Sequence, residues 1–238
     1  MYSDGHQGLP RGVPVQIYDS TCGSRASMSD HRLILEQLLH QLPPIVLASA
    51  SPRRTDLLAS AGIPHRIVVR SIDEAGLSGA TAADTAMQIA RAKFAACEDL
   101  TRQELVICAD TVVELDGQVL GKPVDAQEAR EMLRSLSGRM HAVHTAVVMG
   151  TGGARVETVA TTRVWFRWLP DDWIDAWLAT GKAFDKAGGY AIQEGIGLVA
   201  VERIEGDYNN VVGLSVGDVV QGLETIAAGL ATASEKAS

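Results

Sequence analysis

Apolar and polar positions follow one another along the chain in a pattern that predicts strands and helices in turn. The apolar run 45–49, bounded by proline and serine, is typical of a short buried strand. Residues 53–61 follow as a predicted helix ending before a glycine, and residues 65–69 predict the next strand. Over 81–98, apolar side chains recur every three or four residues, which predicts a helix with one buried face.

The second half of the pattern adds hairpins to this alternation. Residues 105–115 predict a strand, and Asp116-Gly117 predicts a tight turn into 118–120. Asp125 followed by Glu128 resembles a capping box that starts a helix. The remaining predicted elements are strands at about 140–149 and 156–168, a helix over 171–180, a strand near 198–204 and a helix from about Val216. Helices combined with hairpins predict an α/β domain with a mixed sheet.

The two ends of the chain differ from this middle part. Residues 1–43 are expected to be an N-terminal extension, in which 1–30 are rich in Gly, Ser, Pro and Asp and predict a poorly ordered tail or a misassigned upstream start, with Met28 as an alternative start. Residues 44–228 form the predicted domain. Residues 229–238 are expected to be a C-terminal tail, which is small and polar from Ala231.

Composition narrows the class of protein. The 238 residues carry 21 basic and 29 acidic side chains, a net charge of −8, which argues against a protein that coats nucleic acid. Hydrophobic residues make up 46%, so bulk disorder is excluded. Three cysteines without a CxxC motif indicate a reducing, cytoplasmic environment. No apolar run of membrane-spanning length and no secretory leader are present, so neither a membrane protein nor a secreted one is expected.

One familiar motif fails on inspection. Residues 213–217 match GxSxG, the nucleophile motif of serine hydrolases. In that class the base histidine follows the serine in the chain, but His144 is the last histidine here. Ser215 is therefore expected to cap the following helix.

Charged side chains gather where the predicted strands end. Asp110 interrupts an apolar strand, which is costly unless the carboxylate is paired or binds a metal. Ser51, Arg53 and Arg54 begin a helix after the first strand, a geometry that suits phosphate. An ordinary N-capped surface helix with solvated arginines explains the same three residues. Considered by itself, Lys93 is expected to be an ordinary solvated lysine.

Considered together, these segments predict a site for a triphosphate and a divalent metal. Cations are needed for the phosphate oxygens, and carboxylates are needed for Mg²⁺. The cations are Arg53, Arg54, Lys93 and Lys122, and the carboxylates are Glu74 and Asp110.

Six segments resemble the Maf family, which comprises nucleotide pyrophosphatases also described as septum-formation inhibitors. In chain order they are LASASPRR (47–54), ADTVV (109–113), GKP (121–123), LSG (136–138), DKAGGYAIQ (185–193) and EGDYNNVVGL (205–214). The resemblance covers about residues 44–228, and the N-terminal extension has no counterpart in it.

The resemblance implies an elongated mixed sheet with flanking helices, of the inosine-triphosphate-pyrophosphatase type, with a cleft between two lobes. It implies hydrolysis of a nucleoside triphosphate to the monophosphate and pyrophosphate with Mg²⁺ or Mn²⁺. It makes Asp110 the proton acceptor and, with Glu74, a metal ligand; phosphate binding falls on Ser51, Arg54, Lys93 and Lys122. A cytoplasmic homodimer, the removal of non-standard nucleotides and a link to cell-division arrest are further implications.

The resemblance also bears on the choice of base. At three positions the chain matches the family branch that acts on dTTP and UTP, with Arg53, Thr111 and Gln193. The branch that acts on 7-methyl-GTP has Trp, Gln and Glu, in that order, at the same positions. The Gln193 amide can donate to O4 and accept from N3–H of uracil or thymine. Cytosine presents the reverse pattern and would leave buried polar groups unpaired.

Two other functions stay open at this point. The chain could bind nucleotide without hydrolysis, as a regulator of septum formation, although a pure binder has no need of the acidic pair. It could also hydrolyse a modified base such as 7-methyl-GTP.

Overall fold

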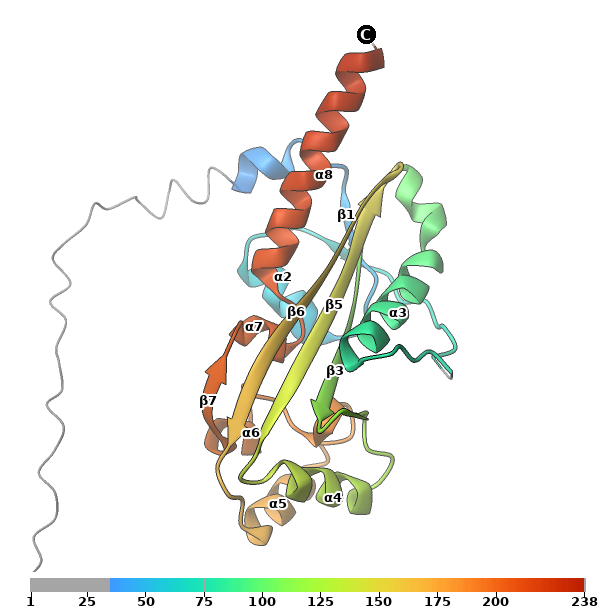
Figure 1. Ribbon diagram of the computed structural model, residues 1–238. Helices are drawn as coiled ribbons and strands as arrows, with labels where there is room; N and C mark the ends of the chain where they lie inside the picture. The colour runs from blue at the N-terminus through green and yellow to red at the C-terminus, as the bar shows by residue number, and fades with distance from the viewer. Residues whose placement is uncertain (1–34, 75, 238) are drawn as a thin grey trace, which may run out of the picture.

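The computed structural model describes residues 35–74 and 76–237. Its centre is a mixed sheet in which the described residues supply seven strands, ordered β2-β1-β3-β5-β6-β7, with β4 paired to β3 (Figure 1). The strands are β1 (Ile45–Leu47), β2 (Arg66–Ile67), β3 (Leu105–Leu115), β4 (Gln118–Leu120), β5 (Met140–Thr151), β6 (Ala154–Phe166) and β7 (Val201–Glu205). Parallel pairing joins β1 to β2 and β3, and the other pairs are antiparallel. The predicted α/β class with a mixed sheet is confirmed.

Helices cover both faces of this sheet. They are α2 (Pro52–Ser60), α3 (Ala82–Ala95), α4 (Ala126–Leu136), α5 (Asp171–Leu178), α6 (Ile196–Ala200), α7 (Tyr208–Val212) and α8 (Val216–Ala237), with short 3₁₀ turns η1 (Glu98–Arg102) and η2 (Ala187–Gly189). In Figure 1, α3 crosses one face of the long strands, α8 lies against the other, and α4 and α5 gather at the lower end. None of the helices in the described ranges is long and apolar enough to span a membrane.

Three apolar clusters hold these layers together. One lies between α3 and the sheet, and a second lies between the opposite face and helices α2 and α8. A third is built from α4, α5 and α6 against the lower ends of β3, β5 and β6. The second and third clusters share a sheet face but have different members, so they form an upper and a lower lobe on that face.

The capping box predicted at α4 is confirmed by its contacts. The Asp125 carboxylate accepts a hydrogen bond from the Glu128 amide at 2.8 Å. The Glu128 carboxylate in turn accepts from the Val124 amide at 2.6 Å. The first contact satisfies an amide that the helix start leaves without a backbone partner, and the second holds the residue before the N-cap.

Two predicted boundaries were wrong. The strand expected near 198–204 begins only at Val201, because Ile196 and Ala200, spaced four apart, bury as one helical face in the lower lobe. The expected tail 229–238 is helical as far as Ala237, since alanine and leucine favour helix and Leu230 packs against the upper lobe. Within the expected N-terminal extension, residues 35–39 are helical. The tail expected at 1–30 lies outside the described residues.

Candidate active site

The site lies where one edge of β3 loses its partner. Strand β1 pairs with β3 only as far as Ile107, and β4 joins the same edge from Val113. Between these points the chain after β1 turns away into α2, and a cavity of about 450 Å³ opens beside β3. That volume suits a ligand of nucleotide size.

Charge in this cavity differs from the charge of the whole chain. Six basic side chains line the cavity, against the acidic side chains of Glu74, Asp110 and Asp185. The chain as a whole carries a net charge of −8. A local excess of cations can therefore attract an anion that the rest of the surface repels.

Asp110 and Lys93 form the centre of the site. The Lys93 ammonium lies 2.6 Å from Oδ1 of Asp110 and 3.0 Å from Oε1 of Glu74. Helix α3 presents the lysine and β3 presents the aspartate, so both come from regular elements. The pairing that the sequence required for a carboxylate inside an apolar strand is present.

Arg54 is placed differently from the phosphate ligand that the resemblance implies. Its guanidinium is buried and donates to the carbonyls of Ala109 and Gly213 at 2.8 and 2.9 Å. It also donates to the hydroxyls of Ser49 and Thr111 at 3.1 and 3.0 Å. Burial lowers the pKa of Arg54 from its ordinary value, and the negative charge of Asp110 opposes that shift.

These contacts show that Arg54 completes the open edge of β3. The carbonyl of Ile107 accepts from the amide of Ala48, which is the last backbone bond on this side. The carbonyl of Ala109 is the next acceptor on the same edge, because carbonyls alternate along a strand. Arg54 supplies the donor that a continuing β1 would have supplied.

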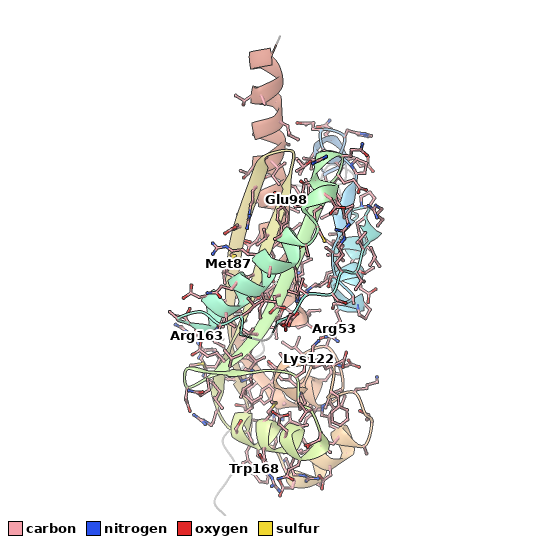
Figure 2. The ribbon with its side chains drawn as sticks, turned by 90° about the vertical axis from the view of Figure 1, so that its right-hand side faces the viewer. Arg53, Met87, Glu98, Lys122, Arg163 and Trp168 are labelled. Carbon is pink, nitrogen blue, oxygen red and sulfur yellow. The ribbon has the colours of Figure 1, made fainter. Side chains whose placement is uncertain are left out.

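Arg53, Lys122 and Ser51 all line the cavity. Figure 2 shows Arg53 and Lys122 at the level between the upper part of the molecule and α4 below. Ser51 precedes α2 and its side chain makes no cap to the helix. The three side chains are thus placed together, as the sequence predicted.

The three positions expected to select the base are not equivalent in the structure. Arg53 and Thr111 line the cavity, whereas Gln193 does not. The Thr111 hydroxyl is bonded to Arg54 and lies 2.9 Å from the Thr145 hydroxyl. Within the described residues, Oε1 of Gln193 is buried without a hydrogen-bond partner. Gln193 thus carries an unused acceptor two residues along the chain from Ala191, which does line the cavity.

Sequence reasoning missed several residues of this site, and three of them share one segment. Asp185, Lys186 and Tyr190 line the cavity, and all three lie in DKAGGYAIQ, one of the six segments that resemble the Maf family. A buried lysine is uncommon unless it is paired, and Lys186 is only 5% exposed. The available sequence signal was the charged pair Asp-Lys, one alanine before two glycines, which marks a turn rather than a helix surface.

The prediction for Ser215 is consistent with its contacts. Its hydroxyl lies 3.5 Å from the amide of Asp218, the N-cap geometry expected at the start of α8. His144 contacts Glu114 and Thr161 instead, at 3.0 and 2.9 Å.

The acidic pair fits a divalent cation that is shared with a bound phosphate. In the described ranges no group of three or more His, Cys, Asp or Glu side chains is gathered into a metal site. Glu74 and Asp110 nevertheless converge on one ammonium group. Magnesium commonly takes one or two carboxylates and completes its shell with water and substrate phosphates.

Comparison with known proteins places this arrangement in a family. A family model described as "Maf-like protein" matches residues 44–226. The dTTP/UTP pyrophosphatase of Thermus thermophilus is 48% identical over 177 residues, which span 74% of this chain and 91% of the relative. That of Geotalea uraniireducens is 46% identical over 189 residues, spanning 77% and 95%. That of Bacillus cytotoxicus is 40% identical over 184 residues, spanning 77% and 96%.

A solved structure of a HAM1 protein from Coxiella burnetii aligns over its full length with 80% of this chain, at 14% identity and a TM-score of 0.40. The match to the family model includes every residue that lines the cavity. The chain therefore belongs to the Maf family.

Proposed function

We propose that this chain hydrolyses nucleoside triphosphates, with dTTP and UTP preferred, to the nucleoside monophosphate and pyrophosphate. The observation that carries the proposal is the contact of Asp110 with Lys93 at the wall of a cation-rich cavity of nucleotide size. Relatives at 40–48% identity bear the name dTTP/UTP pyrophosphatase, which supports the same substrates here.

In the proposed reaction a water molecule attacks the α-phosphorus. A bond forms between the water oxygen and phosphorus, and the bond from phosphorus to the oxygen that bridges the α- and β-phosphates breaks. Asp110 accepts the proton of the water, and the electron pair of the broken bond leaves with pyrophosphate. Lys93 holds the Asp110 carboxylate in one orientation, which is the positioning that a general base requires.

The remaining cations have separate roles in this proposal. Arg53 and Lys122, which line the cavity, stabilise negative charge on the phosphates. Arg54 holds the cavity wall together, because its donors are directed to protein acceptors. A Mg²⁺ or Mn²⁺ ion held by Glu74 and Asp110 would neutralise phosphate charge when bound. Lys93 would then keep the two carboxylates close together when the ion is absent.

Base selection in the proposal depends on Gln193. Its buried, unpaired Oε1 can accept from N3–H of uracil or thymine. A base without that donor would leave the acceptor unsatisfied, which is a strong ground for rejection. A cytoplasmic homodimer and a role in cell division stay predictions.

A substrate panel tests the function. The purified chain is incubated with dTTP, UTP, dCTP, dGTP and 7-methyl-GTP, with Mg²⁺, with Mn²⁺ or with EDTA. Chromatography of the nucleoside monophosphate is the readout, because a coupled pyrophosphatase assay would itself need metal. We expect dTTP and UTP to be hydrolysed fastest, and EDTA to stop the reaction. Tight binding of dTTP without monophosphate release would contradict the proposal and favour a non-catalytic regulator; 7-methyl-GTP as the best substrate would contradict the base assignment.

A further inference from the structure

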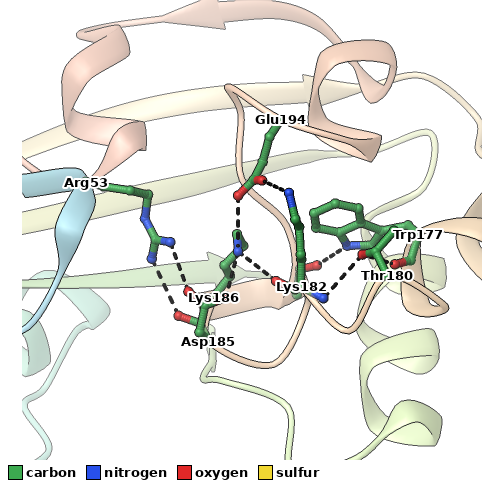
Figure 3. Close-up of polar contacts among 8 residues, drawn as sticks. Arg53, Trp177, Thr180, Lys182, Asp185, Lys186 and Glu194 are labelled. Carbon is green, nitrogen blue, oxygen red and sulfur yellow. Dashed lines mark hydrogen bonds and ion pairs between the residues drawn. The ribbon is translucent and has the colours of Figure 1, made fainter. Parts of the chain in front are cut away.

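An ion pair crosses the cavity between segments that are far apart in the sequence. Nη1 of Arg53 lies 3.1 Å from Oδ2 of Asp185, and Nη2 lies 3.5 Å from the Asp185 carbonyl oxygen (Figure 3). The two residues are 132 positions apart. Arg53 stands at the start of α2, whose Leu58 packs in the upper lobe, whereas Ala183, beside Asp185, packs in the lower lobe. The pair therefore links the two lobes at the cavity.

The other side of Asp185 is also held. Oδ1 of Asp185 accepts from Nζ of Lys186 at 2.6 Å. The same ammonium donates to the Lys182 carbonyl at 2.7 Å and lies 3.2 Å from Oε1 of Glu194. An ammonium has three donors, and these three acceptors use them all. Lys186 thus has no donor left for a phosphate and instead fixes Asp185.

The end of this network adjoins a second base-selecting position. Glu194 directly follows Gln193, and its other oxygen lies 3.0 Å from Nζ of Lys182. A backbone bridge joins Ala191 to Glu194, so the turn that carries Gln193 is closed by the same residue that anchors Lys186. Figure 3 shows the chain of contacts from Arg53 through Asp185 and Lys186 to Glu194.

We propose that Asp185 is a positioning residue for base selection. It holds Arg53 at the cavity, and Lys186 and Glu194 hold Asp185, so that one bonded network sets Arg53 and the Gln193 turn in a fixed relation. The inference rests on the proposed function, in which Arg53 and Gln193 contact the nucleotide. Asp185 itself acts through Arg53 and takes no part in the attack on phosphorus.

If the ion pair only stabilised the fold, its removal would lower stability and leave substrate preference unchanged. The Asp185 side chain is 61% exposed, and exposed ion pairs contribute little to stability. Removing its charge should therefore leave the fold intact, and any change in substrate preference would come from the cavity. Desolvation raises the pKa of Asp185, but the hydrogen bonds from Lys186 and Arg53 together with their positive charges outweigh it, so the pKa lies below the ordinary value and the carboxylate is charged at neutral pH.

The test compares Asp185→Asn, Arg53→Met and the double variant by kcat and KM for dTTP and dCTP. Asp171→Asn is the matched control, because Asp171 forms a similarly exposed ion pair with Arg134 away from the cavity. We expect Asp185→Asn to raise KM for dTTP about tenfold, the loss of one charged hydrogen bond, with a smaller fall in kcat and a reduced preference for dTTP over dCTP. The double variant should be no worse than Arg53→Met alone, and Asp185→Glu should restore part of the preference.

Each failure has a separate meaning. If the wild type and Asp171→Asn hydrolyse dTTP while Asp185→Asn keeps wild-type KM and preference, the positioning role is overturned and the proposed function stands. Additive effects of Asp185→Asn and Arg53→Met would also overturn it, because they would show that Asp185 does not act through Arg53. If the wild type hydrolyses no nucleotide, the proposed function fails and the inference fails with it.

Discussion

The two walls of the cavity are built in different ways. In the acid wall, Lys93 comes from helix α3 and Asp110 from strand β3, which is paired with β5 at every position from Val106 to Glu114. Glu74, its third member, comes from the irregular segment before α3 and contacts Lys93. The loop wall, residues 185–194, consists of a 3₁₀ turn and an isolated bridge, with Gly188 and Gly189 at φ angles of 68° and 73°. The loop wall depends on side-chain contacts for its shape, whereas the acid wall depends on backbone pairing.

This difference fits two separate roles, proton transfer at the acid wall and base selection at the loop wall. Groups that move protons must hold fixed positions, and a central strand provides them. Groups that select a base can lie on a turn, provided that a network such as the one through Asp185 holds the turn in place. Changes at the acid wall should therefore reduce turnover, and changes at the loop wall should alter preference.

The largest expected effect is at the acid wall. Lys93→Met removes the ammonium that orients Asp110 and leaves two carboxylates facing each other. We expect kcat/KM for dTTP to fall at least about 100-fold, measured by monophosphate release. Arg91→Met is the matched control, because Arg91 lies on the same helix but pairs with Glu157 away from the cavity. Equal activity of both variants would remove the distinction between the walls.

The next effect is on stability and separates the two neighbouring arginines. Arg54→Met leaves the buried carbonyls of Ala109 and Gly213 without their donor. The free energy of unfolding should fall by about 3 kcal/mol, measured by urea denaturation. Arg53→Met, which loses a partly exposed ion pair, should cost less than about 1 kcal/mol. Similar losses for both variants would contradict the structural role of Arg54.

A third prediction concerns how stability depends on pH through a buried histidine that contacts the loop wall. Nε2 of His141 lies 2.7 Å from Oη of Tyr190, which lines the cavity. Burial lowers the pKa of His141 from 6.5 to about 4, so the folded chain keeps this ring neutral. The unfolded chain takes up the proton below pH 6.5, and stability from this group is therefore full above that pH and declines as the pH falls toward 4.

When the pH is lowered from 7.5 to 5.0, the titration of His141 should lower the free energy of unfolding by roughly 2 kcal/mol. His141→Gln has no titrating ring, so urea denaturation at the two pH values should show a correspondingly smaller loss than in the wild type. The comparison uses the change with pH, which is separate from any constant cost of the substitution. Equal losses in the two proteins would show that His141 does not titrate as described.

The smallest effect is expected within the loop wall. Gln193→Glu replaces an amide with a carboxylate and removes the donor for O4 of the base. The preference for dTTP over 7-methyl-GTP should fall about tenfold, the scale of one hydrogen bond to a charged or polar group. Unfolding should change little. An unaltered ranking of the substrate panel would contradict the assignment of base selection to Gln193.

The sequence predicted the acid wall better than the loop wall for a physical reason. Asp110 stood out because one carboxylate interrupts an apolar strand, and the hairpin at Asp116-Gly117 fixed where that strand ends. Both signals are local. The contact of Asp110 with Lys93 joins residues only 17 positions apart on adjacent elements.

The loop wall depends on contacts that no local pattern encodes. Asp185 meets Arg53 across 132 positions, and the burial of Lys186 follows from how the lobes pack. The helices α6 and α7 have five residues each, which is too few to show a helical period in the sequence. The hydrogen bonds of Arg54 could not be predicted either, because their acceptors lie on β3 and after α7, far from Arg54 in the sequence.

The most direct test of the account is the hydrolysis of dTTP by Asp110→Asn. The substitution keeps the shape of the side chain but removes its ability to take a proton. We predict that monophosphate release falls by about 10²–10⁴-fold while dTTP still binds and the chain still unfolds cooperatively, with Asp116→Asn at the nearby hairpin as a control of wild-type activity. Release of dTMP by Asp110→Asn at the wild-type rate would contradict the central role given to this carboxylate.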